Sequence, residues 1–225
     1  MSTSVLELPA AGQTASLMIR GPAGLIEAQL AMPREHPAKG GCVICHPHPL
    51  YGGAMSNKVV YTLAATAAKA GFCTLRFNFR GVGKSAGLHD SGHGETDDTV
   101  WLAQQLRAAL PADAPLVLAG FSFGAFVALQ SAAAVKPAAL MSVAPPFGKY
   151  FADAARPPHP GCPWTVIHSR DDDTVAYAET AAELAAYIPA PTLVTVDGAG
   201  HFFHGRLADV NAAFGDLLAQ LTTGG

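Results

Sequence analysis

Residues 115–124 read PLVLAGFSFG, an apolar run that leads into a serine between two glycines. The run has no polar residue before Ser122, which is typical of a strand buried on both faces of a sheet. The residues after the serine, GAFVALQSAAAV, favour a helix. The pattern G-x-S-x-G at 120–124 thus lies between a predicted strand and a predicted helix, where it indicates a nucleophile elbow. Such a turn presents the serine hydroxyl at the start of a helix, where backbone N–H groups stabilise negative charge.

Strand and helix patterns alternate along the rest of the chain. Further apolar runs predict buried strands at 42–45, 72–79, 138–143, 164–168 and 192–196. Helical spacing is found at 58–71, about 95–110, 176–188 and about 206–221. Two earlier segments, 16–20 and 25–33, have the pattern of short strands that extend a sheet at one edge. We therefore expect an α/β fold with a mostly parallel sheet and helices on both of its faces.

Composition limits the classes of partner. The chain has 225 residues, of which 50% are apolar and 14% charged, so we expect one α/β domain spanning 1–225. The formal net charge of −3 gives no reason to expect a nucleic acid or a membrane surface as partner. The opening MSTSVLELPAAG has no basic segment and no long apolar run, so we expect no secretory signal and a cytoplasmic location.

A serine hydroxyl is a weak nucleophile at neutral pH and needs a base, which in turn needs an orienting acid. In elbow-type folds these follow in the chain order Ser, Asp or Glu, His. The segment IHSRDDDTV at 167–175 places three aspartates directly after an apolar strand. We choose Asp172 as the orienting acid because Thr174 and Val175 close the loop, and we keep Asp171 and Asp173 as alternatives.

The base is sought after the next predicted strand. The segment VDGAGHFFHG at 196–205 places His201 after a strand and a turn of small residues. His204, three residues later, fits a pocket or structural role better. We therefore predict His201 as the general base.

The loop HPHPLYGG at 46–53 offers a second backbone donor for an oxyanion. Pro47 and Pro49 have no N–H group, so the donor must be His48, Leu50 or a later residue. We predict the N–H groups of His48 and Phe123 as the oxyanion hole, with Leu50 as the alternative to His48.

The same loop follows CVICH at 42–46, which matches the C-x-x-C-H pattern of haem attachment and, with His48, allows a zinc site. Residues three apart in a strand point to opposite faces, so Cys42 and Cys45 would not converge on one ligand. We therefore expect buried thiols, no metal and no cofactor.

With these residues in place, the chain resembles small bacterial α/β hydrolases related to dienelactone hydrolases, over nearly its full length. The shared landmarks are HPHPLYGGAMSNKVV, LRFNFRGVGKSAG, GFSFGA, the aspartate-rich loop and GAGHFFHG. The resemblance implies an α/β-hydrolase fold, a triad of Ser122, Asp172 and His201, and hydrolysis of small esters. Dienelactone hydrolases proper have a cysteine nucleophile where this chain has Ser122, which counts against a dienelactone substrate.

About twenty residues separate the predicted strands at 138–143 and 164–168, which leaves no room for a cap domain. The site should then be open, and Tyr51, Phe121, Phe147 and Phe202 are candidates to line an apolar pocket, although we expect at least half of the aromatic residues near the site to pack in the core.

The sequence therefore predicts a cofactor-free serine carboxylesterase whose partner is a small-molecule ester. A thioesterase or peptidase with the same triad is the first alternative, and a non-catalytic binding protein on the same fold is the second. The physiological substrate and the oligomeric state are left open.

Overall fold

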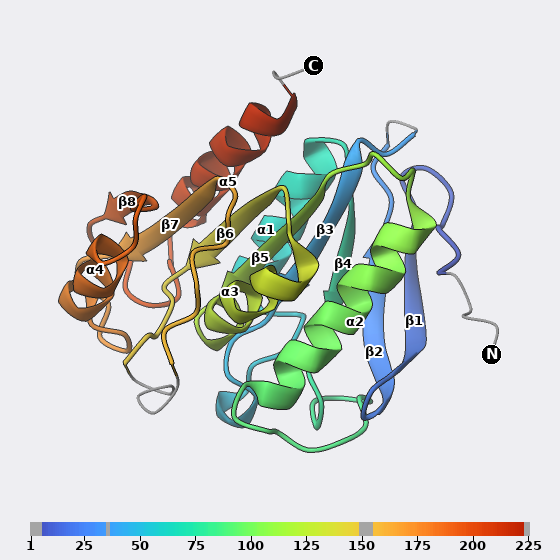
Figure 1. The fold of residues 1–225 in the computed structure, drawn as a ribbon, viewed down its shortest axis with the longest axis horizontal. Coiled ribbons are helices and arrows are strands. Elements are labelled where there is room, and N and C mark those ends of the chain that lie inside the picture. Colours follow the sequence, from blue (N-terminus) through green and yellow to red (C-terminus); the bar gives the residue numbers. More distant parts are fainter. Residues whose placement is uncertain (1–5, 35–36, 149–154, 223–225) are drawn as a thin grey trace.

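The computed structural model describes residues 6–34, 37–148 and 155–222. Among these, eight strands form one sheet in the spatial order β1-β2-β4-β3-β5-β6-β7-β8 (Figure 1). In chain order the strands are β1 (Thr14–Gly21), β2 (Gly24–Ala31), β3 (Gly40–Cys45), β4 (Phe72–Phe77), β5 (Leu116–Phe121), β6 (Ala139–Val143), β7 (Trp164–Ser169) and β8 (Thr192–Val196). The helices are α1 (Lys58–Lys69), α2 (His93–Ala109), α3 (Phe123–Val135), α4 (Tyr177–Ala185) and α5 (Leu207–Thr222), with a 3₁₀ turn at Pro49–Tyr51.

The sheet is parallel from β4 to β8, and β2 pairs antiparallel with both β1 and β4. The expected mostly parallel sheet, extended at one edge by the first two strands, is confirmed. β1 and β2 form a hairpin because only Pro22 and Ala23 separate their paired ends, and two residues suffice for an antiparallel turn.

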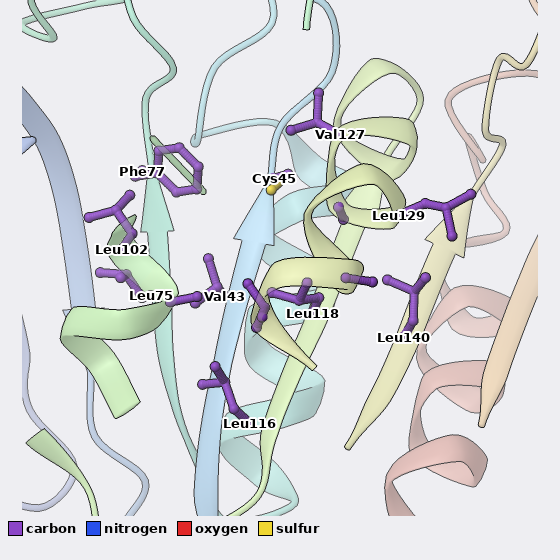
Figure 2. Close-up of a cluster of buried hydrophobic side chains, with 14 of the residues drawn as sticks. Val43, Cys45, Leu75, Phe77, Leu102, Leu116, Leu118, Val127, Leu129 and Leu140 are labelled. Atoms are coloured by element: carbon purple, nitrogen blue, oxygen red, sulfur yellow. The ribbon is translucent and has the colours of Figure 1, made fainter. Parts of the chain in front are cut away.

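Helices cover both faces of the sheet. α2, α3 and α4 pack on one face and α1 and α5 on the other (Figure 1). Figure 2 shows the first interface, where side chains of β3, β4 and β5 such as Val43, Leu75 and Leu118 meet Leu102 of α2 and Val127 of α3. Each such buried side chain contributes about 1.5–3 kcal/mol, which explains why β3 and β5 are apolar at every position.

The two cysteines of β3 lie on opposite faces, as predicted. Cys42 belongs to the α1–α5 face and Cys45 to the α2–α3 face, so they cannot bind one ion together. Burial raises the pKa of Cys45 to about 12, and burial together with the neighbouring thiols raises that of Cys42 further. Both therefore behave as apolar thiols.

β8 departs from the prediction of a buried strand. Thr192 is exposed, and of the five residues only Val196 is buried. β8 is the last strand of the sheet and pairs with β7 alone. A short apolar run looks the same in a central strand and in an edge strand, which is why the sequence misled here.

The topology around β3 predicts a crevice beyond the carboxyl ends of β3 and β5. β3 lies between β4 and β5, and the chain leaves β3 toward α1 on one face but leaves β5 toward α3 on the other. Loops that diverge in this way leave a crevice beyond the carboxyl ends of the two strands, which is where α/β proteins bind ligands. Ser122 and the 46–51 loop both begin at this point.

No cap covers this edge within the described chain. Residues 144–148 and 155–163, which connect β6 to β7, contain no helix or strand, and 149–154 lie outside the described residues. Across the described part of the chain, no helix is both long and apolar enough to cross a bilayer.

Candidate active site

Ser122 stands between the last residue of β5 and the first residue of α3 and has φ +53° and ψ −124°. A residue with a Cβ rarely adopts this conformation, at a cost of about 1–3 kcal/mol. The hydrogen bond from its N–H to the carbonyl of Val143 (2.8 Å) holds the turn against β6. The serine is thus the strained corner that the strand-serine-helix pattern predicts.

The flanking glycines are needed because backbone surrounds them. A Cβ atom on Gly120 would collide with the carbonyl oxygen of Gly124, and one on Gly124 would collide with the carbonyl oxygens of His46 and Cys45. Gly124 thereby allows the start of α3 to pack directly on the end of β3.

We expect Gly124→Ala to lower the free energy of unfolding by about 3 kcal/mol, because the colliding atoms are backbone that cannot rotate away. Gly215→Ala in α5 is the matched control, since a Cβ there meets no atom within 4 Å. The control is expected to stabilise the protein by about 0.5–1 kcal/mol through helix propensity. Urea denaturation of both variants measures the difference, and equal effects would contradict the close approach of α3 to β3.

Three predicted residues meet at this corner. Nε2 of His201 lies 3.1 Å from Oγ of Ser122, and Nδ1 of His201 lies 2.8 Å from Oδ2 of Asp172. Ser122, Asp172 and His201 come from the ends of β5, β7 and β8, and all are at most 8% exposed. With Nδ1–H donating to the carboxylate, Nε2 is left to accept the serine proton.

Asp172 is held as a carboxylate. Its Oδ1 accepts hydrogen bonds from the N–H groups of Thr174 (2.9 Å) and Val175 (2.8 Å). Burial pushes the pKa of Asp172 upward, but hydrogen bonds from His168, His201 and Val175 outweigh burial and hold the pKa well below its ordinary value. The group therefore remains an anion beside His201 at neutral pH.

The other two aspartates of the loop have different contacts. Asp171 accepts hydrogen bonds from the hydroxyl of Ser169 (2.6 Å) and from the N–H groups of Gly198 (2.8 Å) and Gly200 (3.3 Å). It thereby braces the turn that leads to His201. Asp173 is exposed and accepts a bond from Thr174 Oγ1 (3.2 Å). Of the three carboxylates, the structure brings Asp172 to His201.

His168 is the neighbour that the sequence analysis missed. It is the penultimate residue of β7, its side chain is fully buried, and its Nε2 lies 3.1 Å from Oδ2 of Asp172. The signal available was a histidine four residues before Asp172, but inside an apolar strand this position has the appearance of a core residue.

The loop after β3 lies against the elbow. The ring of His48 packs on the ring of Phe123 with a centroid separation of 4.8 Å. The N–H of Leu50 donates to Nδ1 of His48 (3.2 Å), so this alternative oxyanion donor is engaged within its own turn. The geometry therefore favours His48 over Leu50 as the companion of Phe123.

Two hydrogen bonds of the His46 side chain hold this loop in place. Its Nε2 accepts the N–H of Phe79 (3.0 Å), and its Nδ1 donates to the carbonyl of Pro47 (2.6 Å). Phe79 follows β4, so its N–H reaches the histidine ring rather than a neighbouring strand. Burial lowers the pKa of His46 from 6.5 to about 4, against the opposing effect of the Pro47 hydrogen bond.

This shift predicts a pH dependence of stability. Between pH 6.5 and 4 the unfolded chain binds a proton at His46 that the folded chain does not, so stability falls as the pH falls through this window. We expect His46 to account for up to about 3 kcal/mol of lost unfolding free energy between pH 7 and 4. Urea denaturation at several pH values, compared with His46→Gln, isolates this contribution. Equal losses in the two proteins would contradict the assignment.

The predicted apolar pocket needs correction. Phe121 is fully buried, and its ring lies 5.0 Å from the ring of His201, so it supports the imidazole from the core and cannot touch a substrate. Phe147 is nearly buried and lines a cavity of about 320 Å³ whose lining includes neither Tyr51 nor Phe202. Phe121 and Phe147 are thus among the aromatic residues that pack in the core, as expected for at least half of the set.

Tyr51 and Phe202 do reach the surface, with exposures of 74% and 47%. Tyr51 contacts the ring of His48 (4.7 Å) in the loop after β3, and Phe202 contacts the ring of His201 (5.2 Å). His204 is exposed and stacks on Phe202 (5.9 Å), at a distance from the triad. Within the described residues, no group of three His, Cys, Asp or Glu side chains is arranged to hold a metal ion.

Comparison with known proteins agrees with this fold. A family model described as the alpha/beta hydrolase fold matches residues 44–154. An uncharacterized protein of Rickettsia prowazekii is 33% identical over 218 residues, which cover 91% of this chain and 89% of the relative.

Two solved structures are also similar. One from Xanthomonas campestris, described as an α/β serine hydrolase without a lid, is 36% identical with a TM-score of 0.86, and the match covers 97% of this chain and 98% of the other. An α/β serine hydrolase homologue from Coxiella burnetii is 36% identical with a TM-score of 0.82, over 93% of this chain and 99% of the other. The chain therefore belongs to the α/β hydrolase family, among its small serine hydrolases without a lid.

Proposed function

We propose that the protein is a cofactor-free serine carboxylesterase in which Ser122 is the nucleophile, His201 the general base and Asp172 the orienting acid. The observation that carries the proposal is the continuous hydrogen-bond chain from Ser122 Oγ through both ring nitrogens of His201 to Asp172 Oδ2. A binding protein on the same fold has no need of this chain, nor of a strained serine at its end.

The reaction follows from the geometry. Nε2 of His201 takes the proton of Ser122 as Oγ attacks the ester carbonyl, and Asp172 stabilises the resulting imidazolium. The backbone N–H groups of Phe123 and His48 are the proposed donors to the tetrahedral oxyanion, each worth about 3 kcal/mol in the transition state. The imidazolium then protonates the leaving alcohol, and water releases the acyl group from Ser122 by the same sequence of proton transfers.

The surroundings of Ser122 support a small ester with apolar groups. Two exposed side chains, Tyr51 beside His48 and Phe202 beside His201, offer apolar surface to an acyl or alkoxy group. An esterase from Pyrococcus furiosus shares the fold at 19% identity and a TM-score of 0.76.

Intact-mass analysis after treatment with a fluorophosphonate tests the proposal. Wild type is expected to gain one phosphonyl group at Ser122, and folded Ser122→Ala is expected to gain none. Wild type should then hydrolyse p-nitrophenyl acetate or butyrate faster than a matched thioester or anilide. No adduct on folded wild type would reject a serine hydrolase, whereas an adduct together with preferred thioester or anilide cleavage would reject the ester assignment alone.

A further inference from the structure

A second histidine bonds to the aspartate of the proposed triad. Nε2 of His168 lies 3.1 Å from Oδ2 of Asp172 and 3.1 Å from the carbonyl oxygen of Val175. A carboxylate and a carbonyl oxygen only accept hydrogen bonds, so Nε2 of His168 must carry a proton and donate to both.

The other nitrogen of this ring fixes its charge. His168 has no exposed surface, and no described residue gives its Nδ1 a hydrogen-bond partner. A proton on Nδ1 would bury both a positive charge and an unsatisfied donor. The ring is therefore a neutral donor whose hydrogen bonds are all directed at the loop of Asp172.

Both carboxylate oxygens of Asp172 consequently accept two hydrogen bonds each. Oδ2 accepts from His201 (2.8 Å) and His168 (3.1 Å), and Oδ1 accepts from the N–H groups of Thr174 and Val175. The backbone bonds set the position of Oδ1, and His168 fixes the rotation of the carboxylate that brings Oδ2 to His201. We propose that His168 is a positioning residue, which orients Asp172 and shares its negative charge between a reacting imidazole and an inert one.

This inference rests on the proposed function and has a consequence for pH. A carboxylate that has rotated away from His201 no longer stabilises the His201 imidazolium. Loss of the His168 donor should therefore make His201 harder to protonate and move the acid limb of kcat/KM to lower pH.

Other polar and charged groups surround the pair, and the variants below leave them unchanged. The carboxylates of Asp171 and Asp173 flank Asp172, and Ser122 faces His201. On the far side, the ring of Tyr177 lies 5.7 Å from that of His168 and carries the guanidinium of Arg170 over its face. A difference between two substitutions at position 168 consequently reports the donor itself.

The first experiment compares His168→Gln with His168→Leu. The amide nitrogen of glutamine reaches the position of the imidazole Nε2, so His168→Gln keeps a neutral donor and should stay within about threefold of wild-type kcat. His168→Leu fills similar space without a donor, and we expect kcat to fall by about 10- to 100-fold because the carboxylate can rotate away from His201. The acid limb should fall by about 0.5–1 pH unit in His168→Leu alone. Equal kcat and equal acid limbs in the two folded variants would overturn the proposal.

A second experiment needs neither a substrate nor a variant that folds well. Long-range ¹H–¹⁵N spectra of the wild-type imidazoles at pH 8 report the tautomer of each ring. His168 is expected as the Nε2–H form. A cationic His168, or the Nδ1–H form, would overturn the proposal even in an active enzyme. The expected spectrum in a protein that a fluorophosphonate does not label would instead reject the proposed function and leave the contact intact.

Discussion

Replacing Ser122 by alanine is expected to lower kcat for ester hydrolysis by about 10⁶-fold, because among the described residues no other hydroxyl or thiol is bonded to His201. His201→Ala should lose a similar factor, since a serine without a base is not a nucleophile at neutral pH. The double variant should be no slower than either single variant, because the two residues act as one unit. Steady-state kinetics on one chromogenic ester measure all three.

Stability provides the control for these variants. Alanine at 122 keeps the positive φ angle and its strain, so the free energy of unfolding should stay within about 1 kcal/mol of wild type. A folded Ser122→Ala protein that keeps one-hundredth of wild-type kcat would show that another nucleophile does the work.

Asp172→Asn is the second large effect, with an expected loss of about 10⁴-fold in kcat. An amide at this position presents an N–H donor or a neutral oxygen to His201, so the ring is no longer held with its proton on Nδ1 and its Nε2 toward Ser122. The charge that stabilises the imidazolium in the transition state is lost as well.

Asp171→Asn is the matched control, the same chemical change one residue earlier. Its carboxylate bonds the turn at 198–200 and does not contact His201 directly, so we expect a loss below about tenfold. Comparable losses in the two variants would contradict the assignment of Asp172. Kinetics on both proteins, after circular dichroism confirms their folds, make the comparison.

The predictability of this fold and site depends on how local each signal is. The elbow at 120–124 could be predicted because a strand, a sharp turn and a helix within ten residues leave a local pattern. Glycine is required at 120 and 124 because backbone atoms of Gly124, and of His46 and Cys45, leave no room for a Cβ atom. The mostly parallel sheet with helices on both faces follows from the alternation of strands and helices along the chain. The exposure of β8 depends on which strand lacks a neighbour, and no local pattern records that.

Within the site, chain order located Ser122 and His201, but depth and partners could not be predicted. Phe121 and Phe202 are both aromatic residues near the triad, yet one is fully buried and the other is 47% exposed. His168 has the sequence context of a core position because its role appears only when the loop after β7 folds back to bring Asp172 onto the ring. A single sequence does not show which side chains a loop contacts when it folds back onto the strand that precedes it.

The position of His201 beyond an edge strand also sets an order of assembly during synthesis. Ser122 and its elbow are made well before His201, which follows 79 residues later in the chain. At about 5–20 residues per second, this delay is about 4–16 s. In that interval a nascent chain has its strained serine but neither base nor completed sheet. We therefore expect the proposed esterase to gain activity only when the last strand, β8, docks on the sheet and brings His201 to Ser122.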